Sequence, residues 1–167
     1  MPEPPRLATR VWYLELDVLR PAATRADVRR AEVPLGPLNR FFYEEVGRDF
    51  HWVDRLGWDA ARWQAWAERA ETWLVHERGT PAGYAELLPL GDRVDVASLG
   101  VLAAFRGRGL GGALLTRAVE RALELAPRVT VNTCELDGPY ALAGYQSRGF
   151  SVVREEVEPR GRTDLLQ

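Results

Sequence analysis

The stretch LGVLAAFRGRGLGGALL, residues 99–115, decides the fold of this chain. It opens with an apolar run typical of a strand, alternates arginine with glycine, and ends in the small and aliphatic residues of a helix. Glycine has no Cβ, so backbone N–H groups can approach a ligand closely, and the first amides of a helix carry positive partial charge. Arg106 and Arg108 can add charge-assisted hydrogen bonds to phosphate oxygens. The stretch therefore predicts an anion-binding turn between a strand and a helix.

The composition argues against several classes of protein. The 167 residues fit one domain, and no apolar run approaches the ~20 residues that span a bilayer, so no membrane partner is expected. The net charge of −2 gives no overall attraction to nucleic acid, and a single RGRG is not a repeated arginine-glycine segment. One cysteine, Cys134, and two histidines argue against a disulfide and a metal centre. All 22 basic residues are arginine, which removes Schiff-base catalysis and the lysine-dependent phosphate loop.

The first ten residues, MPEPPRLATR, lack the apolar core of a signal peptide. We expect residues 1–10 to form a disordered leader and residues 11–167 to form a single domain. Together with the single cysteine, this predicts a cytoplasmic protein.

The periodicity of apolar residues predicts an α+β chain with a mixed sheet. Strands are expected at residues 11–18, 72–77, 82–88, 93–102, 129–134 and 150–157, and helices at 111–126, at 140–148 and as a pair within 39–70, with Asp59 as an N-cap. The breaks RGTP and LGD are too short for a crossover, so the three strands within 72–102 must pair as antiparallel hairpins. One crossover helix then follows the glycine turn.

Taken alone, the glycines also match a dinucleotide fingerprint. Gly107, Gly109 and Gly112 satisfy G-x-G-x-x-G, and Glu135 ends the following strand, where a ribose-binding acid would lie. A dinucleotide-binding oxidoreductase needs parallel strands before this turn, however, and too little chain follows it to build the rest of such a sheet. This alternative fails if the strands within 72–102 are antiparallel.

Arg106, Gly109 and Gly111 also fit the pattern Arg or Gln, then x-x-Gly-x-Gly or Ala. The segments VDVASLGVL, RGRGLGG, VTVNTC and LDGPYALAGYQSRGF follow in an order that resembles the GNAT superfamily of acyl-CoA-dependent N-acyltransferases, well over residues 73–157 and more loosely before them. The resemblance implies a central, mostly antiparallel sheet flanked by helices, with acetyl-CoA as co-substrate. It assigns the cofactor-binding role to Leu99, Gly100, Val101, Arg106, Gly107, Arg108, Gly109, Leu110, Gly111 and Gly112.

Acyl transfer to an amine needs a neutral amine, a stabilised oxyanion and a proton for the leaving thiolate. The resemblance gives Tyr145 the proton-donor role, and the Val101 N–H is our candidate oxyanion donor. Asp95 lies where many family members carry a strand glutamate that acts as base through water, although aspartate is one methylene shorter. Glu86, on the adjacent strand, is the alternative base, or a solvated outward charge. An acceptor that arrives neutral would need no base.

The aromatic segment FFYEEVGRDFHWVDRLGWDAARW, residues 41–63, is expected to cover the acceptor site in such a fold. Aromatic walls with acidic groups suit a cationic amine, so the expected acceptor is an amine of a small molecule or a peptide. A homodimer is possible by analogy with the family. The competing hypothesis is a GNAT-fold module that binds acyl-CoA without turnover.

Overall fold

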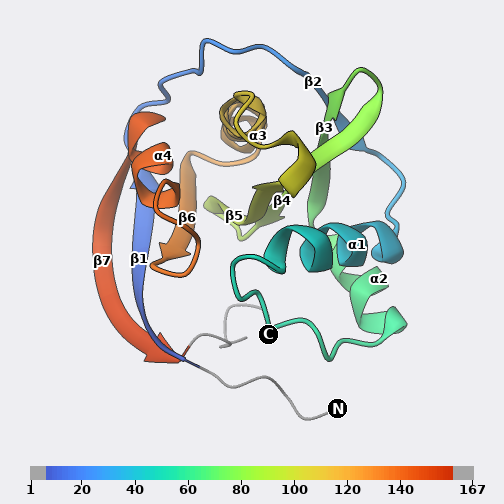
Figure 1. The fold of residues 1–167 in the computed structure, drawn as a ribbon. Coiled ribbons are helices and arrows are strands. Elements are labelled where there is room, and N and C mark those ends of the chain that lie inside the picture. Colours follow the sequence, from blue (N-terminus) through green and yellow to red (C-terminus); the bar gives the residue numbers. More distant parts are fainter. Residues whose placement is uncertain (1–6, 160–167) are drawn as a thin grey trace.

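The computed structural model describes residues 7–159 and arranges them as one seven-stranded sheet between two pairs of helices (Figure 1). The strand order is β2-β3-β4-β5-β6-β1-β7. The strands are β1 Ala8–Leu16, β2 Asp27–Ala31, β3 Glu71–Glu77, β4 Thr80–Pro89, β5 Arg93–Val101, β6 Arg128–Cys134 and β7 Phe150–Pro159. The helices are α1 Gly36–Gly47, α2 Ala60–Arg69, α3 Leu110–Leu125 and α4 Ala141–Ser147, with a short 3-10 turn at Ala103–Phe105.

The predicted hairpins are confirmed. β3 pairs antiparallel with β4, and β4 pairs antiparallel with β5. β5 and β6 are parallel, and α3 connects them. β6 and β7 are both antiparallel to β1, which lies between them, so α4 makes a second crossover and the expectation of a single one is wrong. Because the strands that precede the glycine turn are antiparallel, the chain does not have a dinucleotide-binding fold.

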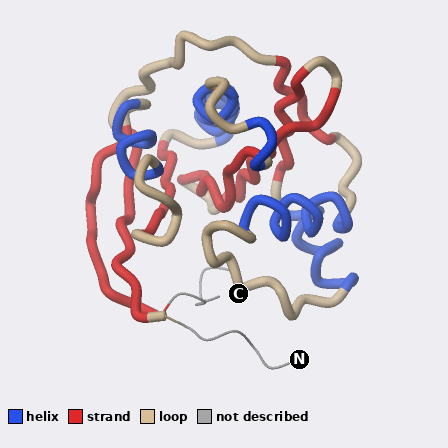
Figure 2. Tube along the Cα trace, viewed as in Figure 1, coloured by secondary structure: helices blue, strands red, loops and turns tan. Residues whose placement is uncertain are grey.

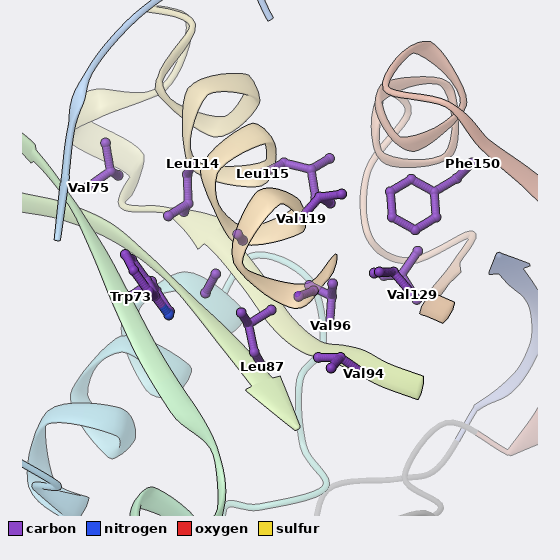
Figure 3. Close-up of a cluster of buried hydrophobic side chains, with 14 of the residues drawn as sticks. Trp73, Val75, Leu87, Val94, Val96, Leu114, Leu115, Val119, Val129 and Phe150 are labelled. Carbon is purple, nitrogen blue, oxygen red and sulfur yellow. The ribbon is translucent and has the colours of Figure 1, made fainter. Parts of the chain in front are cut away.

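The two faces of the sheet carry different layers. α3 packs on one face, where Leu114, Leu115 and Val119 belong to the same buried cluster as Val94 and Val96 of β5 (Figure 3). The predicted apolar stripe of α3 is buried as expected. α1 and α2 cover the opposite face, as the separation of the helices in Figure 2 shows. The sheet is therefore covered by helices on both sides at β4 and β5, the strands beside the glycine turn.

The N-terminal part differs most from expectation. β1 begins at Ala8, inside the expected leader, of which residues 1–6 lie outside the described part of the chain. It ends at Leu16, two residues before the expected end at Val18, whose side chain is 72% exposed. β1 lies between β6 and β7 and is antiparallel to both, while β2 forms the opposite edge of the sheet. Residues 160–167 of the expected domain also lie outside the description.

The pairing of β5 with β6 is incomplete. β5 and β6 are paired only from Arg93 with Arg128 to Val96 with Val131. Beyond Val96, β5 continues alongside β4 as far as Val101 with no pairing on its other side in the described structure. A gap therefore opens between β5 and β6, and the last residues of β5 border it.

Candidate functional site

Two cavities meet at this gap. The β7-side cavity, of about 380 Å³, lies between the connection that follows α1 and one face of β7, and the α3-side cavity, of about 690 Å³, extends along the N-terminus of α3. They share five lining residues: Phe50, Leu99, Asp137, Ala141 and Tyr145. The two cavities therefore form a passage through the sheet, with β5 as one wall and α4 as the other.

The backbone of β5 presents hydrogen-bonding groups to this passage. Leu102 donates its N–H to Ala82 of β4 at 2.8 Å. Because backbone groups alternate sides along a strand, the groups of Gly100 also point toward β4, and those of Leu99 and Val101 point into the gap. The Val101 carbonyl confirms this direction, since it accepts from Arg106 Nε at 3.0 Å. The N–H groups of Leu99 and Val101 are thus directed toward the passage.

The glycine turn leads directly into α3. Gly109 is the N-cap, with φ of 78°, and the first amide bonded within the helix is that of Ala113, which donates to the Gly109 carbonyl at 3.2 Å. The amides of Leu110, Gly111 and Gly112 precede it and have no intrahelical acceptor. Gly111 and Gly112 line the α3-side cavity together with the N-cap Gly109. The expected anion-binding geometry, free helix amides beside a cavity, is therefore present.

The two arginines of the turn differ in position. Arg106 lines the α3-side cavity and donates to Asp49 at 2.8 Å while its guanidinium stacks on Phe50. Arg108 lines neither cavity and stacks on Phe105. Arg106 is therefore the arginine placed to contact a ligand in this cavity.

Tyr145 and Asp95 both line the β7-side cavity, and Tyr145 also lines the passage to the α3 side. Burial raises the pKa of the Tyr145 hydroxyl above its ordinary value, and the charges of Asp137 and Asp95 add to the effect. Burial also raises the pKa of Asp95, although the hydroxyl of Thr130, which donates to it at 2.8 Å, opposes the shift. At neutral pH the site thus holds a protonated phenol beside a carboxylate that binds a proton more readily than usual.

Glu86 lies elsewhere. It is fully buried beneath α1 and α2 and lines neither cavity. Its two oxygens accept hydrogen bonds from Arg55, Asn39 and Trp66. The interpretation of Glu86 as a solvated outward charge is therefore wrong.

Two parts of the site were not predicted from the sequence. Asp137, in the loop between β6 and α4, links this loop to the connection that follows α1, because it accepts a hydrogen bond from Trp52 Nε1 at 3.1 Å. It also accepts from the hydroxyl of Thr133 in β6 at 2.7 Å. A wall of the α3-side cavity comes from residues 22–24, between β1 and β2. Asp137 entered the family resemblance only as part of the segment LDGPYALAGYQSRGF, with no role of its own, and residues 22–24 carry no motif, so neither was assigned to the site.

The model of the acetyltransferase (GNAT) family matches residues 39–150, two thirds of the sequence. The chain belongs to the GNAT family. A mycothiol acetyltransferase from Corynebacterium aurimucosum is 30% identical over 125 residues, which cover 64% of this chain and 40% of that protein. The GNAT chain spans about half the length of the curated relatives it matches.

Solved structures show the same fold. A GNAT-family acetyltransferase from Colwellia psychrerythraea superposes with a TM-score of 0.67 at 14% identity, over 92% of this chain and 55% of that one. An aminoglycoside acetyltransferase from an uncultured soil metagenomic sample has a TM-score of 0.60 at 22% identity, over 81% and 95% of the two chains. The expected GNAT fold is confirmed. Within residues 7–159, no helix is long and apolar enough to cross a membrane, and no acidic, histidine and cysteine side chains gather as metal ligands.

Proposed function

We propose that the chain is an acetyl-CoA-dependent N-acetyltransferase in which an amine attacks the thioester directly. The observation that carries the proposal is the gap between β5 and β6, where a cavity with free helix amides meets a cavity with a titratable carboxylate. The glycine turn suits a pyrophosphate, because the amides of Leu110, Gly111 and Gly112 and the guanidinium of Arg106 supply positive charge. Bound acetyl-CoA would supply an activated acetyl group.

Three groups of the chain would carry the transfer. The Val101 N–H, directed into the gap, would donate to the oxyanion that forms at the thioester carbonyl. Asp95 would remove a proton from the acceptor ammonium, directly or through water, and so leave the neutral amine that attacks the thioester; its raised pKa makes it a stronger base than an ordinary aspartate. Tyr145, at the junction of the cavities, would donate its phenolic proton to the leaving thiolate.

The β7-side cavity would bind the acceptor. It is lined by Asp54, Asp95, Asp137, Glu156 and Glu158, against two arginines, one of which, Arg154, is paired with Glu156 at 3.3 Å. The excess of carboxylates favours a cationic amine of a small molecule or peptide. Arg106 and the α3 amides, in contrast, are confined to the other cavity, so the two substrates would enter from opposite faces of the sheet.

The second candidate is a module that binds acyl-CoA without turnover. It predicts the same CoA binding and no thiol release.

Calorimetric titration distinguishes the proposal from a nucleotide-binding function, since CoA should bind and NAD should not. Thiol release from acetyl-CoA over a panel of alkylamines, polyamines, aminoglycosides and peptide N-termini then tests transfer. Binding without release for any amine would favour the module, and absence of CoA binding would overturn both.

A further inference from the structure

A buried carboxylate beneath the helical layer joins three elements. Glu86 Oε1 accepts from Arg55 Nη1 at 2.7 Å, and Oε2 accepts from Asn39 Nδ2 at 2.6 Å and from Trp66 Nε1 at 2.7 Å. Asn39 belongs to α1, Trp66 to α2, and Arg55 to the connection between them, residues 48–59. One side chain of β4 therefore holds both helices and their connection to the sheet.

Arg55 is enclosed almost as completely as Glu86. Its side chain is only 5% exposed, and its guanidinium carbon lies 4.2 Å from the ring centre of Trp66, 5.1 Å from that of Tyr43 and 5.2 Å from that of Trp58. The planar guanidinium can stack on rings and pair with a carboxylate at the same time, which an ammonium group cannot do. The position of Arg55 is thus fixed by charge and by shape.

This arrangement borders the β7-side cavity. Arg55 lines the cavity together with Trp52 and Asp54 of the same connection. On the other side of the carboxylate, Glu86 is the cross-strand partner of Ser98, which lines the cavity from β5. The Arg55–Glu86 pair therefore lies between the two parts of the chain that line this cavity, residues 48–59 on one side and β5 on the other.

We infer that Glu86 is a positioning residue, which acts through Arg55 to hold residues 48–59 as the acceptor-side wall. A buried arginine without its carboxylate is strongly unfavourable, so the connection is held in the position in which Arg55 reaches Glu86. The inference rests on the proposed function for the identity of the acceptor cavity. It excludes Glu86 as general base, because both of its oxygens already accept hydrogen bonds from protein groups.

Hydrogen–deuterium exchange of the Glu86→Gln variant tests the positional claim without any substrate. The amides of Trp52, Leu56 and Trp58 are bonded to carbonyls within or beside the connection and report its opening. We expect exchange in residues 48–59 to become at least tenfold faster, with no change in residues 106–125. Uniformly faster exchange, or no change in 48–59, would overturn the inference.

Glu71→Gln is the matched control. Glu71 also pairs with an arginine, Arg121 of α3, at 2.8 Å and 3.0 Å, and neither residue lines a cavity. Its loss should leave exchange in residues 48–59 unchanged. Arg55→Lys is the second variant if Glu86→Gln does not fold, because lysine keeps the charge and loses the stacked plane; the same localised exchange is expected.

Kinetics separate positioning from base catalysis. With the amine that releases most thiol, Glu86→Gln should raise the KM for that amine at least tenfold, change kcat less than threefold, and keep the acidic limb of the pH profile. Loss of that limb would make Glu86 the base and overturn the inference. Calorimetric titration with acetyl-CoA should give an unchanged Kd, and a chain that binds no acetyl-CoA at all would instead contradict the proposed function.

Discussion

The Arg106 guanidinium lies 2.8 Å from Asp49 and is thereby tied to the loop that follows α1. If Arg106 binds the CoA pyrophosphate, it must exchange this carboxylate for phosphate oxygens. Both side chains are partly exposed, so the pair contributes little, about 0.5 kcal/mol. Asp49→Asn should therefore bind CoA about twofold to threefold more tightly in calorimetric titration. Arg106→Ala should bind it at least tenfold more weakly, and equal affinity of both variants would remove Arg106 from the CoA site.

Tyr145→Phe tests the proton donor. The ring would keep its edge contact with Phe150, so the fold should be unchanged. Because a positioned acid contributes about 10² to 10⁴ in rate, kcat should fall by about a hundredfold, with the Kd for acetyl-CoA within twofold of the original. Steady-state kinetics and calorimetry measure the two quantities. Full activity would assign the proton transfer to another group.

Asp95→Asn should separate stability from activity. The ionised form of Asp95 is disfavoured by burial, so its pKa is raised in the folded protein above the ordinary 3.8. Ionisation therefore costs stability as the pH rises above about 4, and this cost is fully present above the raised pKa. The variant should have a higher Tm than the original protein at pH 7, and the difference should shrink as the pH falls toward 4.

The same variant should lose at least a hundredfold in kcat/KM at pH 7 if Asp95 is the base. Thermal denaturation from pH 4 to pH 8 and kinetics on the same preparations measure both effects. A lower Tm at pH 7 would contradict the burial argument, and unchanged kinetics would indicate an acceptor that needs no base.

Gly109→Ala tests the glycine turn at the N-terminus of α3, and Gly107→Ala is the control for backbone strain. Both glycines have φ near 80°, where a side chain costs about 1–2 kcal/mol. At Gly109 a Cβ would also lie 2.6 Å from Thr24 Oγ1, whereas nothing lies within 4 Å at Gly107. Denaturant unfolding should show a larger loss for Gly109→Ala, and calorimetry a weaker binding of CoA. Equal effects would show that the contact with Thr24 relaxes without cost.

The elements around the site were predictable because their patterns are local. The hairpins of β3, β4 and β5 follow from short polar breaks, and α3 follows from an apolar stripe that meets the sheet. β2 escaped prediction because its five residues, DVRRA, lie at a sheet edge and show no apolar alternation. The position of β1 between β6 and β7 depends on pairing with strands more than 100 residues away, which periodicity cannot report.

In the candidate site, too, the features with a local sequence pattern were predictable and those that depend on distant residues were not. The glycine turn and its free amides were predictable from one continuous stretch. The burial of Glu86 and its pairing with Arg55 were not predictable, since Arg55 lies 31 residues earlier and no local pattern connects the two residues. The roles of Tyr145 and Asp95 came from the family resemblance and stay predictions.

The measurement that tests the central claim most directly follows free CoA and acetylated amine together, by thiol titration and mass spectrometry, across the amine panel. We predict that at least one cationic amine gives one acetylated molecule per CoA released, and that Tyr145→Phe slows both equally. Acetyl-CoA binding with no acetylated product from any amine would contradict the account.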